Sequence, residues 1–467
     1  MVFSSLFFLF FFLPLNIILY FSFKNLKIRN FILVVFSLIF YAWGEPVWIG
    51  LLVLSSLIDY ANGLFIEKHK GTPIAKWGLY STLFFNLGFL LTFKYSDFII
   101  DNLNFLLGTE MSKPGFLLPI GISFYTFQTI SYTIDVYKGE VKAQRSFLNF
   151  LLFVSLFHQL VAGPIVRYSH IASEIENRSF NWRDFSNGIS RFSIGLFKKV
   201  CIANIAGELC AQFLEQDILG LTFAGGWFGI LMYSIQIYFD FSGYSDMAIG
   251  LGWMFGFHYH ENFKYPYLAS SISDFWRRWH ISLSTFFKDY VYIPLGGNRH
   301  HQVRNLFIVW GLTGLWHGAS WNFVLWGLYF GVLLFLEKIV LARVLDKLFI
   351  GLRHLYALFF IVLGWAIFYF TDFQRLLDFF KLIFGWTGNQ WIDFSTSQKI
   401  TENAFWILLA VILCLPVYSG FRHLTRMYVG NSSVRAALSL TISFTFFMSA
   451  VFFLVGSTYN PFIYFRF

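Results

Sequence analysis

His317 is a titratable side chain in a long apolar stretch. Between Leu306 and Leu336 the only other ionisable group is the phenol of Tyr329, and the stretch contains no Asp, Glu, Lys or Arg. A side chain that titrates near neutral pH is costly to place in a membrane and usually has a function there. A neutral imidazole could accept a proton from a hydroxyl that attacks a carbonyl carbon, whereas a structural histidine would only bond a neighbouring helix.

A second group of polar side chains lies in segment 257–305, which is polar, aromatic and basic between apolar stretches. We expect a helix over about residues 271–290, in which four polar side chains would share one face at helical spacing. Such a face could line a passage for an anionic, phosphate-bearing donor, or it could belong to an interfacial helix whose arginines extend to water. The four residues are Ser273, Arg277, His280 and Ser284.

Two carboxylates, Asp240 and Asp246, lie in an apolar run and need partners there. They could orient a histidine or neutralise an arginine, and we favour structural ion pairing over direct catalysis. The candidate partners are His317, His280, Arg277 and Arg278.

The chain ends on the aromatic run PFIYFRF at 461–467. A terminal segment normally frays into water, which disfavours such a composition. We expect this tail to fold into an apolar groove and to present the Tyr464 hydroxyl at a defined place. An aromatic anchor at the membrane surface is the alternative.

Composition identifies the class of protein that must position these groups. The 467 residues are 57% hydrophobic, 22% aromatic and 13% charged, with mean hydropathy +0.61. Soluble domains contain about 25% charged residues, so we expect an all-α integral membrane protein. The net charge of +9 fits cytoplasmic loops beside anionic lipid and does not indicate nucleic-acid binding. The three cysteines have apolar neighbours, and no Cys/His cluster has the spacing of a metal site.

Apolar segments predict roughly twelve membrane spans. Basic residues follow the first segment and precede the last, which places both termini outside the cytoplasm. We found no internal repeat, which disfavours a transporter. The segments lie near 3–23, 31–43, 46–66, 77–95, 116–136, 147–166, 189–213, 222–256, 306–336, 351–371, 403–419 and 437–456.

Several sequence blocks together resemble the membrane-bound O-acyltransferase superfamily, and specifically its bacterial branch that contains the alginate O-acetyltransferase membrane subunit. The most specific blocks are WRRWHISLS at 276–284 and LWHGASWNFVLWG at 315–327, and the tail PFIYFRF matches as well. The resemblance covers nearly the whole chain. Further matching blocks are 118–139, 160–167 and 239–257.

This resemblance implies one transmembrane domain over 1–467, in which roughly twelve helices and further re-entrant or interfacial helices surround a central tunnel. The final span and an acyl-relay tail would occupy 437–467. The invariant family histidine falls on His317 and the second family histidine on His280. The tyrosine proposed in relatives to hold the acyl group falls on Tyr464.

The resemblance further implies a multi-pass protein of the bacterial inner membrane that transfers an acetyl group from a cytoplasmic thioester, with acetyl-coenzyme A as donor and no bound cofactor. A periplasmic SGNH-type acetyltransferase would pass the acetyl group to a polysaccharide such as alginate or peptidoglycan. D-Alanyl transfer to teichoic acid, a transporter and a non-enzymatic scaffold remain alternatives. We expect donor-binding or orienting roles for Arg277, Arg278, Asp240, Asp246, Ser273 and Asn322.

Overall fold

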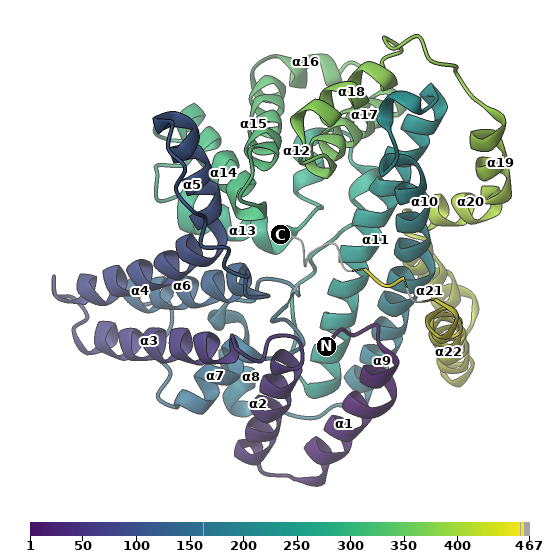
Figure 1. The fold of residues 1–467 in the computed structure, drawn as a ribbon. Helices are drawn as coiled ribbons and strands as arrows, with labels where there is room; N and C mark the ends of the chain where they lie inside the picture. Colours follow the sequence, from purple (N-terminus) through teal and green to yellow (C-terminus); the bar gives the residue numbers. More distant parts are fainter. Residues whose placement is uncertain (162, 458, 462–467) are drawn as a thin grey trace. The chain divides into compact units, whose positions relative to one another are not determined.

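The computed structural model of the chain describes residues 1–161, 163–457 and 459–461. In these residues all regular secondary structure is helical, which confirms the predicted all-α class (Figure 1). The chain forms two compact units. Met1–Phe192 and Tyr244–Glu261 form the first unit, and Ser193–Gly243 and Asn262–Phe467 form the second.

The first unit packs its early helices around buried polar groups. The Asn86 side chain donates to the Asp59 carboxylate over 2.8 Å and accepts from the hydroxyl of Thr129. These bonds join helices α3, α4 and α6 without an exposed charge. The helices of this unit are η1 (Phe8–Phe12), α1 (Leu13–Ser22), α2 (Leu26–Ala42), α3 (Ile49–Lys68), α4 (Ala75–Leu90), η2 (Leu91–Tyr95), α5 (Ser96–Leu107), α6 (Ile122–Lys138), α7 (Phe147–Ser155), α8 (Tyr168–Asn177), most of α9 (Trp182–Phe197) and the end of α11 (Phe223–Phe255).

The second unit contains the end of α9, most of α11 and every later helix, and it holds both candidate histidines. Its further helices are η3 (Lys198–Asn204), α10 (Ile205–Leu214), η4 (Ile218–Gly220), η5 (Pro266–Leu268), α12 (Ile272–Trp276), α13 (Ile281–Phe287), η6 (Lys288–Tyr292), α14 (Gln302–His317), α15 (Trp321–Leu336), η7 (Glu337–Leu341), α16 (Ala342–Leu345), α17 (Ile350–Tyr369), α18 (Phe373–Ile383), α19 (Phe394–Glu402), α20 (Ala404–Leu413), α21 (Val417–Tyr428) and α22 (Ser432–Gly456).

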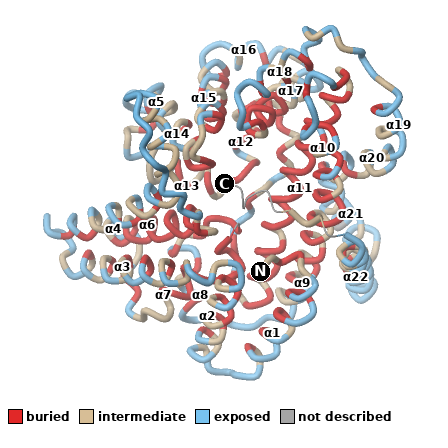
Figure 2. The backbone as a smooth tube through the Cα atoms, in the orientation of Figure 1, coloured by how far each residue is buried: buried red, intermediate tan, exposed pale blue. Residues whose placement is uncertain are grey.

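Among the described residues, five helices are long and apolar enough to cross a membrane, or six if the bent pair α20 and α21 forms one span. They identify a multi-pass membrane protein, while the total of roughly twelve spans stays a prediction. Most residues of α22 are exposed although its sequence is apolar, as lipid contact requires (Figure 2). The five helices are Ile49–Lys68, Ala75–Leu107, Trp321–Leu345, Ile350–Tyr369 and Ser432–Gly456.

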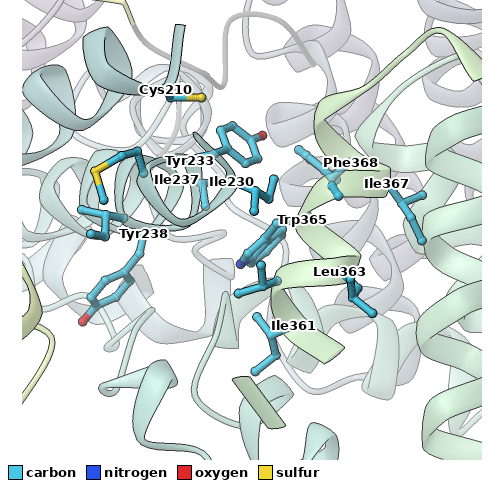
Figure 3. Close-up of a cluster of buried hydrophobic side chains, with 14 of the residues drawn as sticks. Cys210, Ile230, Tyr233, Ile237, Tyr238, Ile361, Leu363, Trp365, Ile367 and Phe368 are labelled. Carbon is cyan, nitrogen blue, oxygen red and sulfur yellow. The ribbon is translucent and has the colours of Figure 1, made fainter. Parts of the chain in front are cut away.

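The core of the second unit is an apolar cluster formed mainly by α11 and α17, with further side chains from α10, α15 and α18. In Figure 3, Trp365 and Phe368 of α17 lie among the aliphatic and aromatic side chains of α11, such as Ile230 and Tyr233. Trp365 and Trp326 are among the largest side chains that are fully buried. Large rings that interdigitate this closely leave little freedom, so the cluster is a rigid support for the neighbouring polar groups.

The apolar stretch 306–336 forms two helices, because the chain turns after His317. Helix α14 ends there, and α15 starts at Trp321. The two helices approach closely through glycines: a Cβ on Gly314 would lie 2.3 Å from the carbonyl oxygen of Phe323, and one on Gly327 would lie 2.3 Å from that of Trp310. Only residues without a side chain permit this approach, which packs the end of α14 closely against α15.

Candidate functional site

His317 is enclosed by aromatic rings at the end of α14. Its side chain is 3% exposed. The imidazole packs edge-on against Trp326 at 4.9 Å and Phe368 at 5.2 Å between ring centroids, and against Trp316 at 4.9 Å. Three rings from three helices therefore hold the imidazole in an apolar environment, where a proton transfer is shielded from bulk water.

Asn322 bonds the backbone that carries one of these rings. From the first turn of α15, its side-chain amide donates to the carbonyl oxygens of Ile367 and Phe368, each over 3.5 Å. These carbonyls lie in the last turn of α17, where a donor from another element satisfies groups that the helix leaves unbonded. Asn322 therefore holds the backbone at Phe368, whose ring contacts His317, and its donor-binding or orienting role stays a prediction.

His280 is the second buried imidazole and lies at a break between two short helices. Its side chain is 1% exposed, and its φ of 44° is left-handed, which is uncommon for a residue other than glycine. Its Nδ1 lies 3.2 Å from the side-chain oxygen of Asn262, and its ring packs on Phe241 at 4.6 Å. Burial lowers the pKa of His280 to about 3, so this imidazole is neutral near pH 7.

Trp316 links the two histidines. Its indole packs against His317 and also against His280, with a centroid distance of 5.8 Å to the latter ring. The sequence placed these imidazoles in separate segments, and the fold arranges them on one indole. The two candidate catalytic residues therefore belong to one cluster of side chains.

The expectation of one helix over residues 271–290 was wrong. Helix α12 ends at Trp276 and α13 begins at Ile281, because the chain takes the left-handed turn at His280 between them. The side chains predicted to share a face are therefore separated. Arg277 is exposed whereas His280 is buried, and the Ser273 hydroxyl donates to the buried carboxylate of Glu337. The predicted polar stripe along one helix does not form.

Glu337 itself was missed by sequence reasoning. Glu337 is buried and accepts from the backbone N–H groups of Ile272 and Ser273 over 2.5 and 2.8 Å, and from the Ser273 hydroxyl over 2.7 Å. A carboxylate at a helix N-terminus satisfies free N–H groups and is favoured by the helix dipole. Its position at the end of an apolar run was the available signal, since a charge there requires partners.

Asn262, also missed, fixes the backbone around His280. Its side-chain oxygen accepts from the N–H and the hydroxyl of Ser282 over 3.1 and 2.9 Å, and its backbone carbonyl accepts from the N–H of Ile281 over 3.0 Å. Asn262 is fully buried, so these bonds compete little with water. It is a positioning residue for His280.

The two carboxylates of the apolar run have basic partners, as predicted, but the expected arginines were wrong. Asp240 pairs with Lys199 over 2.6 Å, and Asp246 pairs with Arg191 over 2.8 Å. Arg278 instead bonds Asp274 one helical turn earlier, over 2.9 Å. A single sequence cannot identify partners that lie about 40 or more positions away.

The tail is described as far as Pro461, so the predicted acyl-relay residue Tyr464 lies outside the described residues. Within the second unit, the described site therefore comprises His317 and His280 with their aromatic and polar supports. A buried imidazole among apolar rings, with a second neutral imidazole on the same indole, is suited to general base chemistry on a hydroxyl.

Comparison with known proteins agrees with this class of membrane protein. Residues 140–412 match the family model of the MBOAT, membrane-bound O-acyltransferase family. The chain is 36% identical to the probable alginate O-acetylase AlgI of Pseudomonas putida over 100% of both chains, and 39% identical to that of Pseudomonas aeruginosa over 94% of this chain and 85% of the relative. It is 33% identical to the peptidoglycan O-acetyltransferase of Helicobacter pylori over 100% of this chain and 98% of the relative.

The fold and the site define the class of this protein: it is a helical, multi-pass membrane protein with two buried histidines in its second unit. The chain belongs to the membrane-bound O-acyltransferase family, as its sequence blocks predicted. It is an O-acyltransferase.

Proposed function

We propose that this protein is a membrane O-acetyltransferase that takes an acetyl group from acetyl-coenzyme A at the cytoplasmic face and passes it across the membrane to a polysaccharide. The observation that carries the proposal is the burial of His317 among Trp316, Trp326 and Phe368 in a chain of this family. The names of the relatives, alginate O-acetylase and peptidoglycan O-acetyltransferase, support acetyl transfer to a polysaccharide.

In the proposed reaction His317 is the general base. It accepts the proton of the Tyr464 phenol while the phenol oxygen attacks the carbonyl carbon of the thioester. The carbon–sulfur bond breaks, coenzyme A leaves as a thiolate, and the thiolate takes the proton from the imidazolium. An unassisted phenol has a pKa of about 10 and is almost fully protonated at neutral pH, so base assistance contributes about 10²–10⁴ in rate.

The donor is oriented by His280 and by the two neighbouring arginines. The neutral His280 imidazole shares an indole with His317. Its Nδ1 donates to the side-chain oxygen of Asn262, so its Nε2 accepts a hydrogen bond from an amide N–H of the coenzyme A donor without adding charge. The exposed guanidinium of Arg277 offers paired donors to a donor phosphate, and Arg278, held by Asp274, lies beside it. Ser273 and Asp240 support this region through Glu337 and Lys199, without touching the donor.

The acetyl group remains on Tyr464 as a phenyl ester, which is reactive enough to pass it on. An SGNH-type acetyltransferase outside the cytoplasm attacks the ester carbonyl, releases the phenol and acetylates a sugar hydroxyl of alginate, peptidoglycan or a similar polymer. We further propose that the chain lies in the bacterial inner membrane with both termini outside the cytoplasm. In this proposal lipid surrounds a single domain of roughly twelve spans, and these spans enclose a tunnel.

The test is acetylation of the polymer in cells that produce variant proteins at equal membrane levels. His317→Ala and Tyr464→Phe should each abolish acetylation, whereas His300→Ala, which removes an exposed imidazole, should leave it unchanged. Normal acetylation by Tyr464→Phe would refute the relay and leave the enzyme assignment intact. Normal acetylation by His317→Ala would refute the proposed base.

Purified protein separates the enzyme from its rivals. Release of coenzyme A from acetyl-coenzyme A in detergent, dependent on His317, is expected of an acyltransferase and not of a transporter or a scaffold. A preference for a D-alanyl thioester over an acetyl thioester would replace the proposed donor with that of teichoic acid D-alanylation.

A further inference from the structure

A buried ion pair in the second unit binds the beginning of the C-terminal tail. Lys199 and Asp240 are 2.6 Å apart, and their side chains are 3% and 2% exposed. Burial of two charges is costly, and it is tolerated when each has further polar partners. The Lys199 ammonium has such a partner, because it also donates to the backbone carbonyl of Pro461.

A second buried residue bonds the same stretch of tail. The side-chain amide of Asn204 donates to the carbonyl oxygen of Tyr459 over 3.2 Å and to the side-chain oxygen of Asn460 over 3.3 Å. The last turn of α22 and Ser457 are largely exposed, whereas Tyr459, Asn460 and Pro461 are half-buried. The chain therefore leaves the surface after α22 and enters a polar site that bonds three consecutive residues.

An unusual helical segment brings the two binding side chains together. Lys199 and Asn204 are five positions apart, and in an α-helix with 3.6 residues per turn they would point about 140° apart. They lie in η3, a π-helix over Lys198–Asn204, in which hydrogen bonds link residues five apart and stack them one turn above the other. This segment presents both donors to the tail.

The site that binds the tail adjoins the candidate catalytic cluster along α11. Phe241, the residue after Asp240, packs on the His280 ring at 4.6 Å. Tyr464 follows Pro461 by three positions, and a chain of three residues spans at most about 11 Å. A fixed Pro461 consequently limits how far the tail hydroxyl can move from this region.

We propose that Lys199, Asp240 and Asn204 form a tail anchor that holds residues 459–461 in place while the acetyl group is transferred. The inference rests on the proposed relay and names the residues that position it. These residues act through the tail and do not touch the donor, so they are positioning residues.

Cross-linking tests whether the tail stays on the anchor. The double variant Asn204→Cys/Asn460→Cys, made in a protein whose native Cys201, Cys210 and Cys414 are replaced by alanine, should form a disulfide on mild oxidation in membranes, since polar atoms of the replaced side chains are 3.3 Å apart. The cross-linked protein should retain most of the activity that it shows after reduction. The control pair Gln212→Cys/Asn460→Cys, with an exposed position on α10, should not cross-link. Failure to cross-link the first pair, or loss of transfer on cross-linking, would overturn the anchor.

A polar-to-apolar pair of variants tests whether the anchor contributes to transfer. Asn204→Leu removes both amide contacts, keeps the number of side-chain heavy atoms and leaves no buried charge, whereas Gln212→Leu makes a comparable change at an exposed position. Misplacement of a reacting group by about 1 Å can cost about 10²-fold. We therefore expect Asn204→Leu to lower polymer acetylation at least about tenfold, while acetyl transfer to a soluble phenol added to the assay stays at the level of Gln212→Leu. An equal fall in both reactions would indicate general damage and refute a positioning role.

The anchor and the relay fail in different ways. If Tyr464→Phe acetylates the polymer normally, the relay is wrong, whatever the cross-linking result. If Tyr464→Phe is inactive, Asn204→Leu acetylates the polymer normally and the cross-linked protein loses acetyl transfer, then the anchor alone is wrong.

Discussion

Replacement of Gly314 by alanine should displace His317 without touching it. Gly314 lies three positions before His317 on α14, and an added Cβ would lie 2.3 Å from the carbonyl oxygen of Phe323 and 3.4 Å from the Cα of Gly327. The 2.3 Å contact is with backbone, so no side-chain rotation relieves it. Helices α14 and α15 must move apart by roughly 1 Å to restore an ordinary contact.

The magnitude follows from two opposing terms. Alanine is a better helix former than glycine by about 0.5–1 kcal/mol, whereas overpacking in a well-packed interface costs about 1–3 kcal/mol. Gly311→Ala is the matched control on the same helix, because nothing lies within 4 Å of its added Cβ. We expect the control to be neutral or slightly stabilised, and Gly314→Ala to lose about 1–2 kcal/mol of unfolding free energy.

Activity should fall more than stability. A displacement of about 1 Å in the base relative to the acceptor can reduce the rate about 10²-fold, and α14 carries His317 at its end. Thermal unfolding in detergent, followed by tryptophan fluorescence, and acetyl transfer by membranes at equal protein level measure both effects. Gly314→Ala with the stability and activity of Gly311→Ala would refute the close packing that places the imidazole.

Three further changes test individual contacts. Glu337→Gln should destabilise the protein by about 2–3 kcal/mol, because hydrogen bonds to a charged group contribute about 1.5–3 kcal/mol, and unchanged thermal unfolding would contradict the cap on α12. Lys199→Met should lower the free energy of unfolding by about 3–5 kcal/mol, because it leaves the Asp240 carboxylate buried and unpaired. The double variant Lys199→Met/Asp240→Leu should recover most of this loss. A double variant as unstable as the single one would argue against the ion pair. Burial lowers the pKa of the His280 imidazole to about 3 in the folded protein, so the imidazole of the unfolded chain takes up a proton at higher pH. The neutral, buried His280 therefore contributes its full stabilisation above about pH 6.5. This contribution is lost as the pH falls from about 6.5 to about 3, by up to about 1.4 kcal/mol per pH unit. His280→Gln should flatten that part of the stability profile, and an unchanged slope would place the imidazole in water.

Composition and single costly residues predicted much of the molecule. Titratable side chains in an apolar membrane segment cost free energy wherever they lie, unless partners surround them. The sequence alone therefore indicated that His317, in a charge-free stretch, and Asp240, in an apolar run, are buried with partners. The helical class followed from hydropathy alone, because lipid-exposed backbone must bond within its own segment.

Local reasoning failed where a distant contact overrides helical periodicity. The segment around His280 has the spacing of one helix, yet Asn262 bonds Ser282 and Ile281 and stabilises a left-handed residue that propensity disfavours. The ion-pair partners, the cap from Glu337 and the π-helix at Lys199 likewise depend on elements far apart in sequence. None of them leaves a periodic signal in a single chain.

The central claim is that His317 acts as the base in an acetyl transfer from acetyl-coenzyme A. The initial rate of coenzyme A release by purified protein, wild type against His317→Ala at matched folding and concentration, tests it most directly. The account predicts a loss of at least about 10²-fold, the lower end of what general base catalysis contributes. A His317→Ala protein that releases coenzyme A at the wild-type rate would contradict it.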